Sequence, residues 1–265
     1  MIAPDTLAVF LALGAFAGVI AGLLGVGGGL IIVPVLVWAL PAQGVGPDSL
    51  THLAIGTSLA TIVPTSISSV RAHHRHGAVR WPVFAQLAPG IVIGALAGAA
   101  LADTLASDTL KRVFGVFELL VAAQLAFGRP PAPHRRLPGA PGLGAAGAVI
   151  GAVSALLGIG GGTLTVPFLA WCNVPLRQAV ATAAAVGLPI AVAGAAGFIA
   201  AGWGKPGLPP GATGYVYWPA LAGIAAASVL AAPLGAKLAH TLPTTILRRV
   251  FAIFLATLGV RMLSG

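Results

Sequence analysis

Residues 22–36 of the chain read GLLGVGGGLIIVPVL, and residues 155–169 read ALLGIGGGTLTVPFL. Both stretches place a run of glycines and then a proline inside an apolar segment. Glycine disfavours a helix interior through its backbone entropy, and proline does so because it lacks an amide hydrogen. A pattern that occurs twice therefore predicts a helix interruption that the protein uses at two sites.

The composition of the chain indicates that it lies in a lipid bilayer and not in water. Of 265 residues, 58% are hydrophobic and 7% are charged, which is too few to cover the surface of a water-soluble protein. Apolar segments recur at lengths near the roughly 20 residues that a helix needs to cross a bilayer. The sequence therefore predicts an all-α, polytopic membrane protein. Its net charge of +9 comes from basic residues in short turns, which indicates membrane topology rather than a nucleic-acid partner.

Turns rich in glycine, proline and charge divide the chain into eight apolar segments. The longest turn, GRPPAPHRRLPGAPG at 128–142, cannot form a helix and separates two sets of four. We expect a first transmembrane repeat at 1–127, a cytoplasmic linker at 128–141 and a second transmembrane repeat at 142–265. The segments lie near residues 6–40, 50–70, 82–102, 109–127, 142–172, 176–201, 217–239 and 243–263.

The two sets of segments match each other in order. The glycine motifs recur at a spacing of 133 residues (158 minus 25). A Trp-Pro pair at 81–82 recurs at 218–219, and LKRVF at 110–114 recurs as LRRVF at 247–251. The register drifts by only a few loop residues, so the protein is a fused duplication. Repeats of this kind are typical of membrane transporters.

The first segment of each repeat is too long for one crossing, because residues 6–40 as a straight helix would extend about 50 Å. If each folds back as two half-helices, the repeats are inverted and ten of the fourteen Lys and Arg residues share the cytoplasmic side. If each crosses once, the repeats are parallel and eight of the fourteen do. The distribution favours inverted repeats with broken, re-entrant first segments, and a single crossing is the alternative.

The interruptions predict an anion site. Non-helical backbone inside a membrane must be buried in protein or line a cavity, and the first amides of each new half-helix lack helical partners. Glycine leaves those amides accessible, and the helix dipole favours a negative ligand. The alternative is that the glycines only allow close helix packing. The candidate ligand-binding residues are Gly25, Gly27, Gly28, Gly29, Gly158, Gly160, Gly161 and Gly162.

Two prolines follow the glycines at matched positions. Pro34 and Pro167 cannot donate a backbone hydrogen bond, so each frees a carbonyl close to the glycine run. Helix packing alone does not require this, so we interpret both prolines as part of the helix break.

The doubled glycine motifs, the two Trp-Pro segment starts and the LKRVF and LRRVF segment starts resemble the sulfite exporter TauE/SafE family of bacterial membrane permeases. The resemblance covers nearly the whole chain. It implies a multi-pass carrier in the bacterial inner membrane that moves sulfite, an organosulfonate or a related sulfur oxyanion. The residues themselves indicate only a small anion, and sulfur comes from the resemblance alone.

Hydroxyl side chains could complete such a site, because they donate to an oxyanion without a fixed charge. The segment GTSLATIVPTS at 56–66 offers several, of which Thr57 and Ser58 are the first candidates together with Thr182 in the second repeat. Thr163 and Thr165 directly follow the second glycine run. The alternative for each is a hydrogen bond to the preceding turn of its own helix.

Glu118 lies inside an apolar segment, whereas its counterpart in the second repeat is Leu255. A carboxyl group in a membrane is costly unless it is protonated, paired or functional. Glu118 is therefore a candidate for proton coupling, with protons as the coupling ion. The alternatives are pairing with Lys111 or Arg112, two turns away, and a position near the membrane interface.

Other functions find little support in the residues. The chain contains neither HExxH nor GxSxG, which argues against an intramembrane enzyme. The histidines of HHRH at 73–76 lack acidic or thiolate neighbours, so no metal site and no cofactor is expected. We expect transport by alternating access of the two halves. An anion channel and a non-transporting membrane subunit stay as alternatives, and the sequence does not define the oligomeric state.

Overall fold

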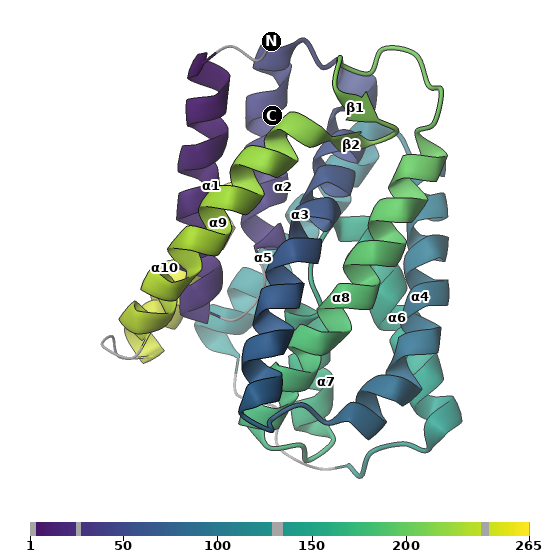
Figure 1. The fold of residues 1–265 in the computed structure, drawn as a ribbon, viewed down its shortest axis with the longest axis vertical. Coiled ribbons are helices and arrows are strands. Elements are labelled where there is room, and N and C mark those ends of the chain that lie inside the picture. Colours follow the sequence, from purple (N-terminus) through teal and green to yellow (C-terminus); the bar gives the residue numbers. More distant parts are fainter. Residues whose placement is uncertain (1–3, 25–27, 129–134, 240–243, 265) are drawn as a thin grey trace.

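The computed structural model describes residues 4–24, 28–128, 135–239 and 244–264. The described chain is all-α apart from one short hairpin, as predicted (Figure 1). The first repeat contains helices α1 (Pro4–Leu24), α2 (Gly29–Ala39), α3 (Pro47–Arg75), α4 (Trp81–Thr104) and α5 (Ser107–Phe127), with the 3-10 turn η1 (Leu40–Gln43). The second contains α6 (Ala140–Leu157), α7 (Gly162–Trp171), α8 (Leu176–Ala201), strands β1 (Ala212–Thr213) and β2 (Val216–Tyr217), α9 (Trp218–Ala239) and α10 (Thr244–Ser264).

The first segment of each repeat is two helices rather than one, so the predicted interruptions are confirmed. In the first repeat α1 is followed by the shorter α2, and in the second α6 is followed by the shorter α7. Among the described residues, α3, α4, α6 and α8 are long and apolar enough to cross a membrane. The chain is therefore a multi-pass membrane protein.

The helices that correspond in the two repeats run in opposite directions. Near the start of α3, the ring of His52 stacks on Tyr215, which follows the end of α8. Just past the other end of α3, the amide of Arg80 donates to the hydroxyl of Thr182 near the start of α8. The start of one helix thus lies beside the end of its counterpart. The repeats are inverted, and both chain ends lie in the upper part of Figure 1.

The two repeats are interlocked by exchanged helices. Helix α1 packs mainly on α9 of the second repeat, and α6 packs mainly on α4 of the first. Glycines allow these contacts: a Cβ added to Gly94 of α4 would overlap the carbonyl of Ala148, and one added to Gly14 of α1 would lie 2.5 Å from that of Ile224. Small residues of this kind let membrane helices approach closely. Packing is therefore carried largely by glycines outside the doubled motif.

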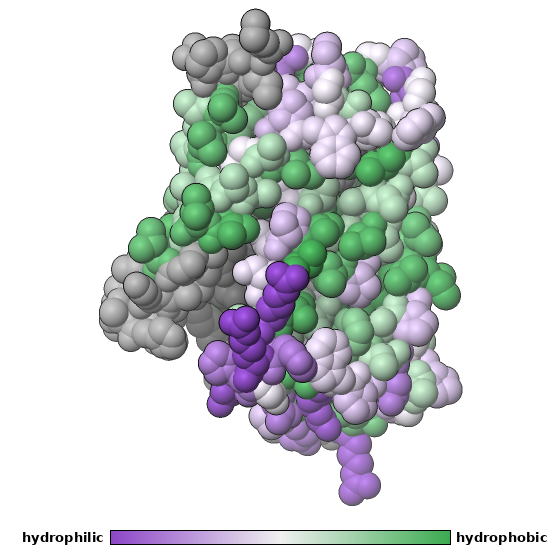
Figure 2. All heavy atoms as spheres, viewed as in Figure 1, coloured by the Kyte–Doolittle hydropathy of each residue, from purple (hydrophilic) through white to green (hydrophobic). Residues whose placement is uncertain are grey.

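The outer surface matches a membrane environment. Large apolar side chains such as Ile93, Leu120 and Leu230 are more than half exposed along the helices. Figure 2 shows hydrophobic residues across the middle of the molecule and hydrophilic residues at the lower end, where α3 ends and α4 begins. Arg71, Arg75 and Arg80 lie at this end. We refer to it below as the basic end.

Candidate functional site

The two interruptions lie at the glycines. In the first repeat α1 ends at Leu24 and α2 begins at Gly29, with Gly28 before it. Gly25 and Gly27 lie outside the described residues. In the second repeat Gly158 has a φ of 68°, the left-handed conformation in which glycine commonly ends a helix, and its amide donates to Ala155. Helix α7 then begins at Gly162.

The two prolines do not mark the breaks themselves. Pro34 lies inside α2 and Pro167 inside α7, and both helices continue through them. Each proline removes one intrahelical bond by lacking an amide hydrogen, and the short helix tolerates this loss. The interruption belongs to the glycine runs alone, which corrects the assignment of Pro34 and Pro167 as helix-breaking residues.

The two interruptions touch each other at the interface between the repeats. A Cβ added to Gly29 would overlap the carbonyl oxygen of Gly158 and come 2.8 Å from the Cα of Ile159. The same Gly158 carbonyl accepts a hydrogen bond of 2.8 Å from the hydroxyl of Ser58 on α3. Ser58 is fully buried. Its hydroxyl therefore fixes the second interruption to the first repeat.

A cavity of about 180 Å³ lies beside the interruptions. The backbone of Gly28, Gly160, Gly161 and Gly162 forms part of its wall, so four of the predicted glycines line one space. Gly29 and Gly158 lie in the contact between the interruptions and are not in the wall. The hydroxyl side chains in the wall are those of Thr61, Thr65, Ser66, Ser69 and Ser228.

The wall of this cavity is uncharged, because none of its described residues is Asp, Glu, Lys or Arg, and it is mostly apolar with a few hydroxyl and amide groups. Two donors meet at one side of it. The position of a Cβ on Gly187 lies 3.2 Å from the hydroxyl oxygen of Ser66 and 3.5 Å from the amide nitrogen of Gly161. Gly187 itself lines the cavity. Because it has no side chain, a solute atom can approach both groups there.

Thr57 and Thr182 lie elsewhere, although the sequence pairs them correctly. The hydroxyl of Thr57 accepts a hydrogen bond of 2.9 Å from the amide of Tyr217, and that of Thr182 accepts one of 3.0 Å from the amide of Arg80. Tyr217 and Arg80 each precede a Trp-Pro helix start. The two threonines are fully buried and do not line the cavity. They anchor equivalent helix starts in the two repeats.

Thr163 and Thr165 are also outside the cavity wall. Both belong to the first turns of α7, and Thr165 is fully buried. Within the described part of the chain, neither hydroxyl oxygen has a hydrogen-bond partner. The predicted hydroxyls thus fall into two groups: those of Thr57, Ser58 and Thr182 bond to backbone, and those of Thr163 and Thr165 have no partner among the described residues. None of the five lines the cavity.

Glu118 is fully buried in α5. Neither of its carboxylate oxygens has a partner among the described residues. Arg112, which the sequence offers as a partner, instead forms an ion pair of 2.8 Å with Asp108. Glu118 does not line the cavity. It is therefore a buried carboxyl group separate from the candidate anion site.

Sequence reasoning missed several residues of the cavity wall, among them Ser69, Ser228 and Gly187. Ser69 lies beside Ser68 near the end of α3, Ser228 is a single hydroxyl in the apolar helix α9, and Gly187 is one of 37 glycines. Ser228 also donates a hydrogen bond of 2.8 Å to the carbonyl of Gly14. The helical spacing of Ser66 and Ser69, three residues apart on α3, is the signal that could have found one of them, because it places both on one face.

Inverted repeats, paired helix interruptions at the repeat interface and an uncharged cavity with hydroxyl and amide groups beside them together define a membrane transporter rather than an enzyme. Comparison with known proteins agrees. Residues 10–262 match the model of the family described as Sulfite exporter TauE/SafE. The chain belongs to this family.

Curated relatives carry the same general description. The chain is 36% identical over 255 residues to a probable membrane transporter protein of Haemophilus influenzae, covering 95% of this chain and 96% of the relative. It is 27% identical over 268 residues to a probable membrane transporter protein of Methanocaldococcus jannaschii, covering 97% and 95%. No solved structure matches the chain significantly.

Proposed function

We propose that the protein is a secondary transporter that carries a small sulfur-containing anion, sulfite or an organosulfonate, across the bacterial cytoplasmic membrane by alternating access. The binding site would be the cavity beside the two interruptions. The observation that carries the proposal is the approach of the Ser66 hydroxyl and the Gly161 amide to one point in that cavity. Sulfur is added because the family's description names sulfite.

The composition of the wall favours an anion that must bind and leave. Amides at a helix start and hydroxyl groups both donate hydrogen bonds, and the dipole of α7 adds a partial positive charge near Gly162. A fixed cation in the wall would hold an oxyanion more strongly and slow its release. Thr61 and Thr65 already donate to Ser58 and Ile62 of their own helix. Ser66 and the backbone amides are therefore the proposed donors.

The moving units would differ from the two halves expected from the sequence. Because α1 packs on α9 and α6 packs on α4, each packed pair contains one helix from each repeat. We assign alternating access to motion between these composite bundles, with the interruptions at their boundary. Glu118 supplies the proposed proton-coupling group, since its carboxyl is buried and unpaired within the described residues.

Purified protein in proteoliposomes tests the substrate and the mechanism. Sulfite, thiosulfate, an alkyl sulfonate and sulfate would each be offered against a concentration gradient. A transporter coupled to a proton gradient accumulates its substrate, whereas a channel only equilibrates it. No flux of any of these anions above that of empty liposomes would contradict the proposal.

Binding can be measured independently of flux. A ligand present at 100 times its Kd stabilises the native state by about 2.7 kcal/mol, so the true substrate should raise the melting temperature. The variant Gly28→Leu is suited as a control, because a Cβ at Gly28 approaches only the flexible end of Ile32, at 3.0 Å. It should fold, fill the cavity and lose the ligand-dependent shift.

A further inference from the structure

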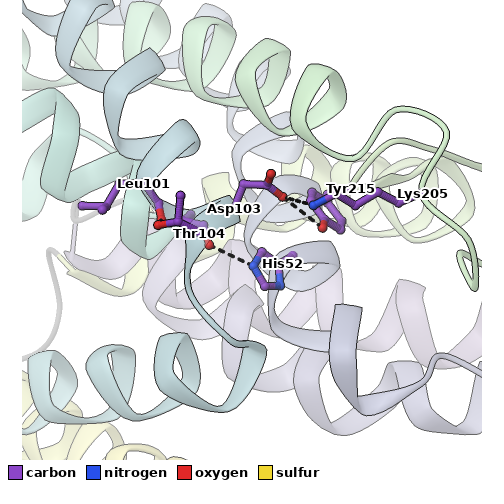
Figure 3. A network of polar contacts seen from close by, with 7 residues as sticks. His52, Leu101, Asp103, Thr104, Lys205 and Tyr215 are labelled. Carbon is purple, nitrogen blue, oxygen red and sulfur yellow. Dashed lines mark hydrogen bonds and ion pairs between the residues drawn. The ribbon is translucent and has the colours of Figure 1, made fainter.

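A cluster of polar side chains joins the two repeats at the end of the molecule opposite the basic end. We call it the Asp103 cluster; it consists of His52, Asp103, Lys205 and Tyr215 (Figure 3). Lys205 forms an ion pair with Asp103, and the hydroxyl of Tyr215 donates to the same carboxylate oxygen at 3.2 Å. Asp103 lies on α4, whereas Lys205 and Tyr215 lie in the connection between α8 and α9. The contacts therefore link elements more than 100 residues apart.

Aromatic contacts extend the cluster into the protein. The ammonium of Lys205 lies 5.3 Å from the centre of the Tyr215 ring. The ring of His52 on α3 stacks on the Tyr215 ring, with the two ring centres 4.9 Å apart. His52 is held in turn by a contact of 3.0 Å between its Nε2 and the carbonyl of Ala102. Two helices, α3 and α4, and the connection between α8 and α9 thus meet in this cluster.

Below the cluster, the hairpin between α8 and α9 closes the interior. Tyr215, Val216 and Tyr217 are each at most 5% exposed. Tyr217 meets Phe10 of α1 edge to face, and Tyr215 meets Phe198 of α8 in the same way. The amide of Tyr217 is the group held by Thr57. The hairpin therefore forms an apolar plug beneath the charged surface cluster.

The candidate anion cavity lies on the other side of this plug. Its wall on α3 runs from Thr61 to Ser69, whereas His52 lies near the start of the same helix. At 1.5 Å per residue, Ser66 is about 21 Å further along the helix axis than His52. Ser69 is partly exposed and lies two residues before Arg71 of the basic end. The cavity is thus nearer the basic end, and the Asp103 cluster lies over the opposite route.

From this arrangement we infer that the Asp103 cluster and the hairpin beneath it form the gate of the transport path on the side opposite the basic end, closed in this structure. The inference rests on the proposed function and deepens it. Opening this side requires the α8–α9 connection to move away from α4, which separates Lys205 and Tyr215 from Asp103. Asp103 and Lys205 are positioning residues, because they act on access and do not touch the anion.

The charges of the cluster are partly solvated, so a substitution that removes one of them should change the population of the open state only modestly. The side chains of Lys205 and Asp103 are 40% and 29% exposed. An ion pair of this exposure shifts a two-state equilibrium by roughly two- to five-fold. The expected result of removing it is a rise of that size in the open population.

Accessibility of one introduced cysteine measures this population without any substrate. Cys172 would be replaced by Ala, and Thr61→Cys would place a thiol in the cavity wall. A membrane-impermeant maleimide is added on the side of the Asp103 cluster. Asp103→Asn, Lys205→Met and Tyr215→Phe should each raise the labelling rate, and the exchanged pair Asp103→Lys with Lys205→Asp should return it toward the starting value.

The pair Asp108 and Arg112 provides a matched control. It is an exposed ion pair four residues apart within α5, close to the end of α4, but it does not join the two repeats. Asp108→Asn should leave the labelling rate unchanged. An equal rise in this control, or no rise in the three cluster variants when they are folded, overturns the gate. Changed labelling in a protein that moves none of the tested anions supports the gate and contradicts only the substrate.

Discussion

Gly29 of the first repeat lies directly against the Gly158 carbonyl of the second, so the two helix interruptions form one contact. A Cβ on Gly29 would overlap that carbonyl, whereas one on Gly158 would lie 2.9 Å from the side chain of Val33. The contact joins the first turn of α2 to the end of α6 and explains why position 29 needs glycine, and position 158 needs it also because its φ is 68°.

The variant Gly29→Ala should therefore destabilise the protein. The added methyl group has no space and would force the two interruptions apart, a form of overpacking that costs about 1–3 kcal/mol. Thermal unfolding in detergent measures the effect. Gly144→Ala is the matched control, because a Cβ there meets nothing within 4 Å. Equal melting temperatures for the two variants would show that the interruptions are not in tight contact.

Removal of the Ser58 hydroxyl should also lower stability. Ser58→Ala leaves the buried Gly158 carbonyl without the hydrogen bond that α3 supplies, and an unsatisfied buried acceptor costs about 1–3 kcal/mol. Thr257→Ala removes an exposed hydroxyl that bonds only to Ile253 of its own helix. Its melting temperature should change little. Loss of stability in Thr257→Ala alone would contradict the role assigned to Ser58.

Gly187→Ala tests the proposed anion position. Its Cβ would lie 3.2 Å from the Ser66 hydroxyl and 3.5 Å from the Gly161 amide, so the methyl group fills the point that both donors face. We expect a folded protein whose affinity for the anion falls at least tenfold, a loss of about 1.4 kcal/mol. Isothermal titration with the substrate measures it. Retained affinity in a folded variant places the anion elsewhere.

Glu118→Gln tests proton coupling. The amide has the shape of a protonated carboxyl group but cannot titrate, so flux should lose its dependence on pH while the protein stays folded. Glu118→Leu is a second variant, because the counterpart in the other repeat is the fully buried Leu255. Flux measured across a range of pH checks both. Unchanged pH dependence in the two variants would remove Glu118 from the mechanism.

The contacts of Lys205 and Tyr215 with Asp103 should persist through neutral pH. Its hydrogen bond to Asp103 raises the pKa of the Lys205 ammonium above the ordinary value, and burial raises the pKa of the Tyr215 phenol. A cation whose pKa is raised by folding stabilises the folded contact below its unfolded pKa and loses that effect only as pH rises through the folded value. Because the maleimide reacts with the thiolate, the labelling rate is divided at each pH by that of a free thiol with the same reagent, and this ratio should be constant from about pH 6 to 9. A rise at the acidic end would instead implicate His52, which stacks on Tyr215.

Much of the fold follows from sequence patterns of long range. The glycine runs repeat across the two halves and occur in apolar surroundings, so they identify both interruptions and the duplication. The distribution of basic residues favours the inverted arrangement, which the opposite directions of α3 and α8 confirm. These features depend on composition over many residues, and they are insensitive to the orientation of any one side chain.

The site was less predictable because hydroxyl groups in apolar helices have several uses. Thr57 and Thr182 were paired correctly by sequence, but they hold the amides of Tyr217 and Arg80 instead of facing the cavity. Which face of a helix meets a neighbour depends on the packing of exchanged helices. The Asp103 cluster depends on a loop contact between distant residues, for which the local sequence gives no signal.

The exchange of α1 and α6 between the repeats also constrains how the protein can be made. When residues 1–127 have entered the bilayer, α1 and α4 expose glycine faces whose partners, α9 and α6, have not yet been synthesised. The glycine faces of α1 and α4 therefore stay without their native contacts until α6 and α9 are inserted. Neither repeat can then bury these glycine faces without helices of the other repeat.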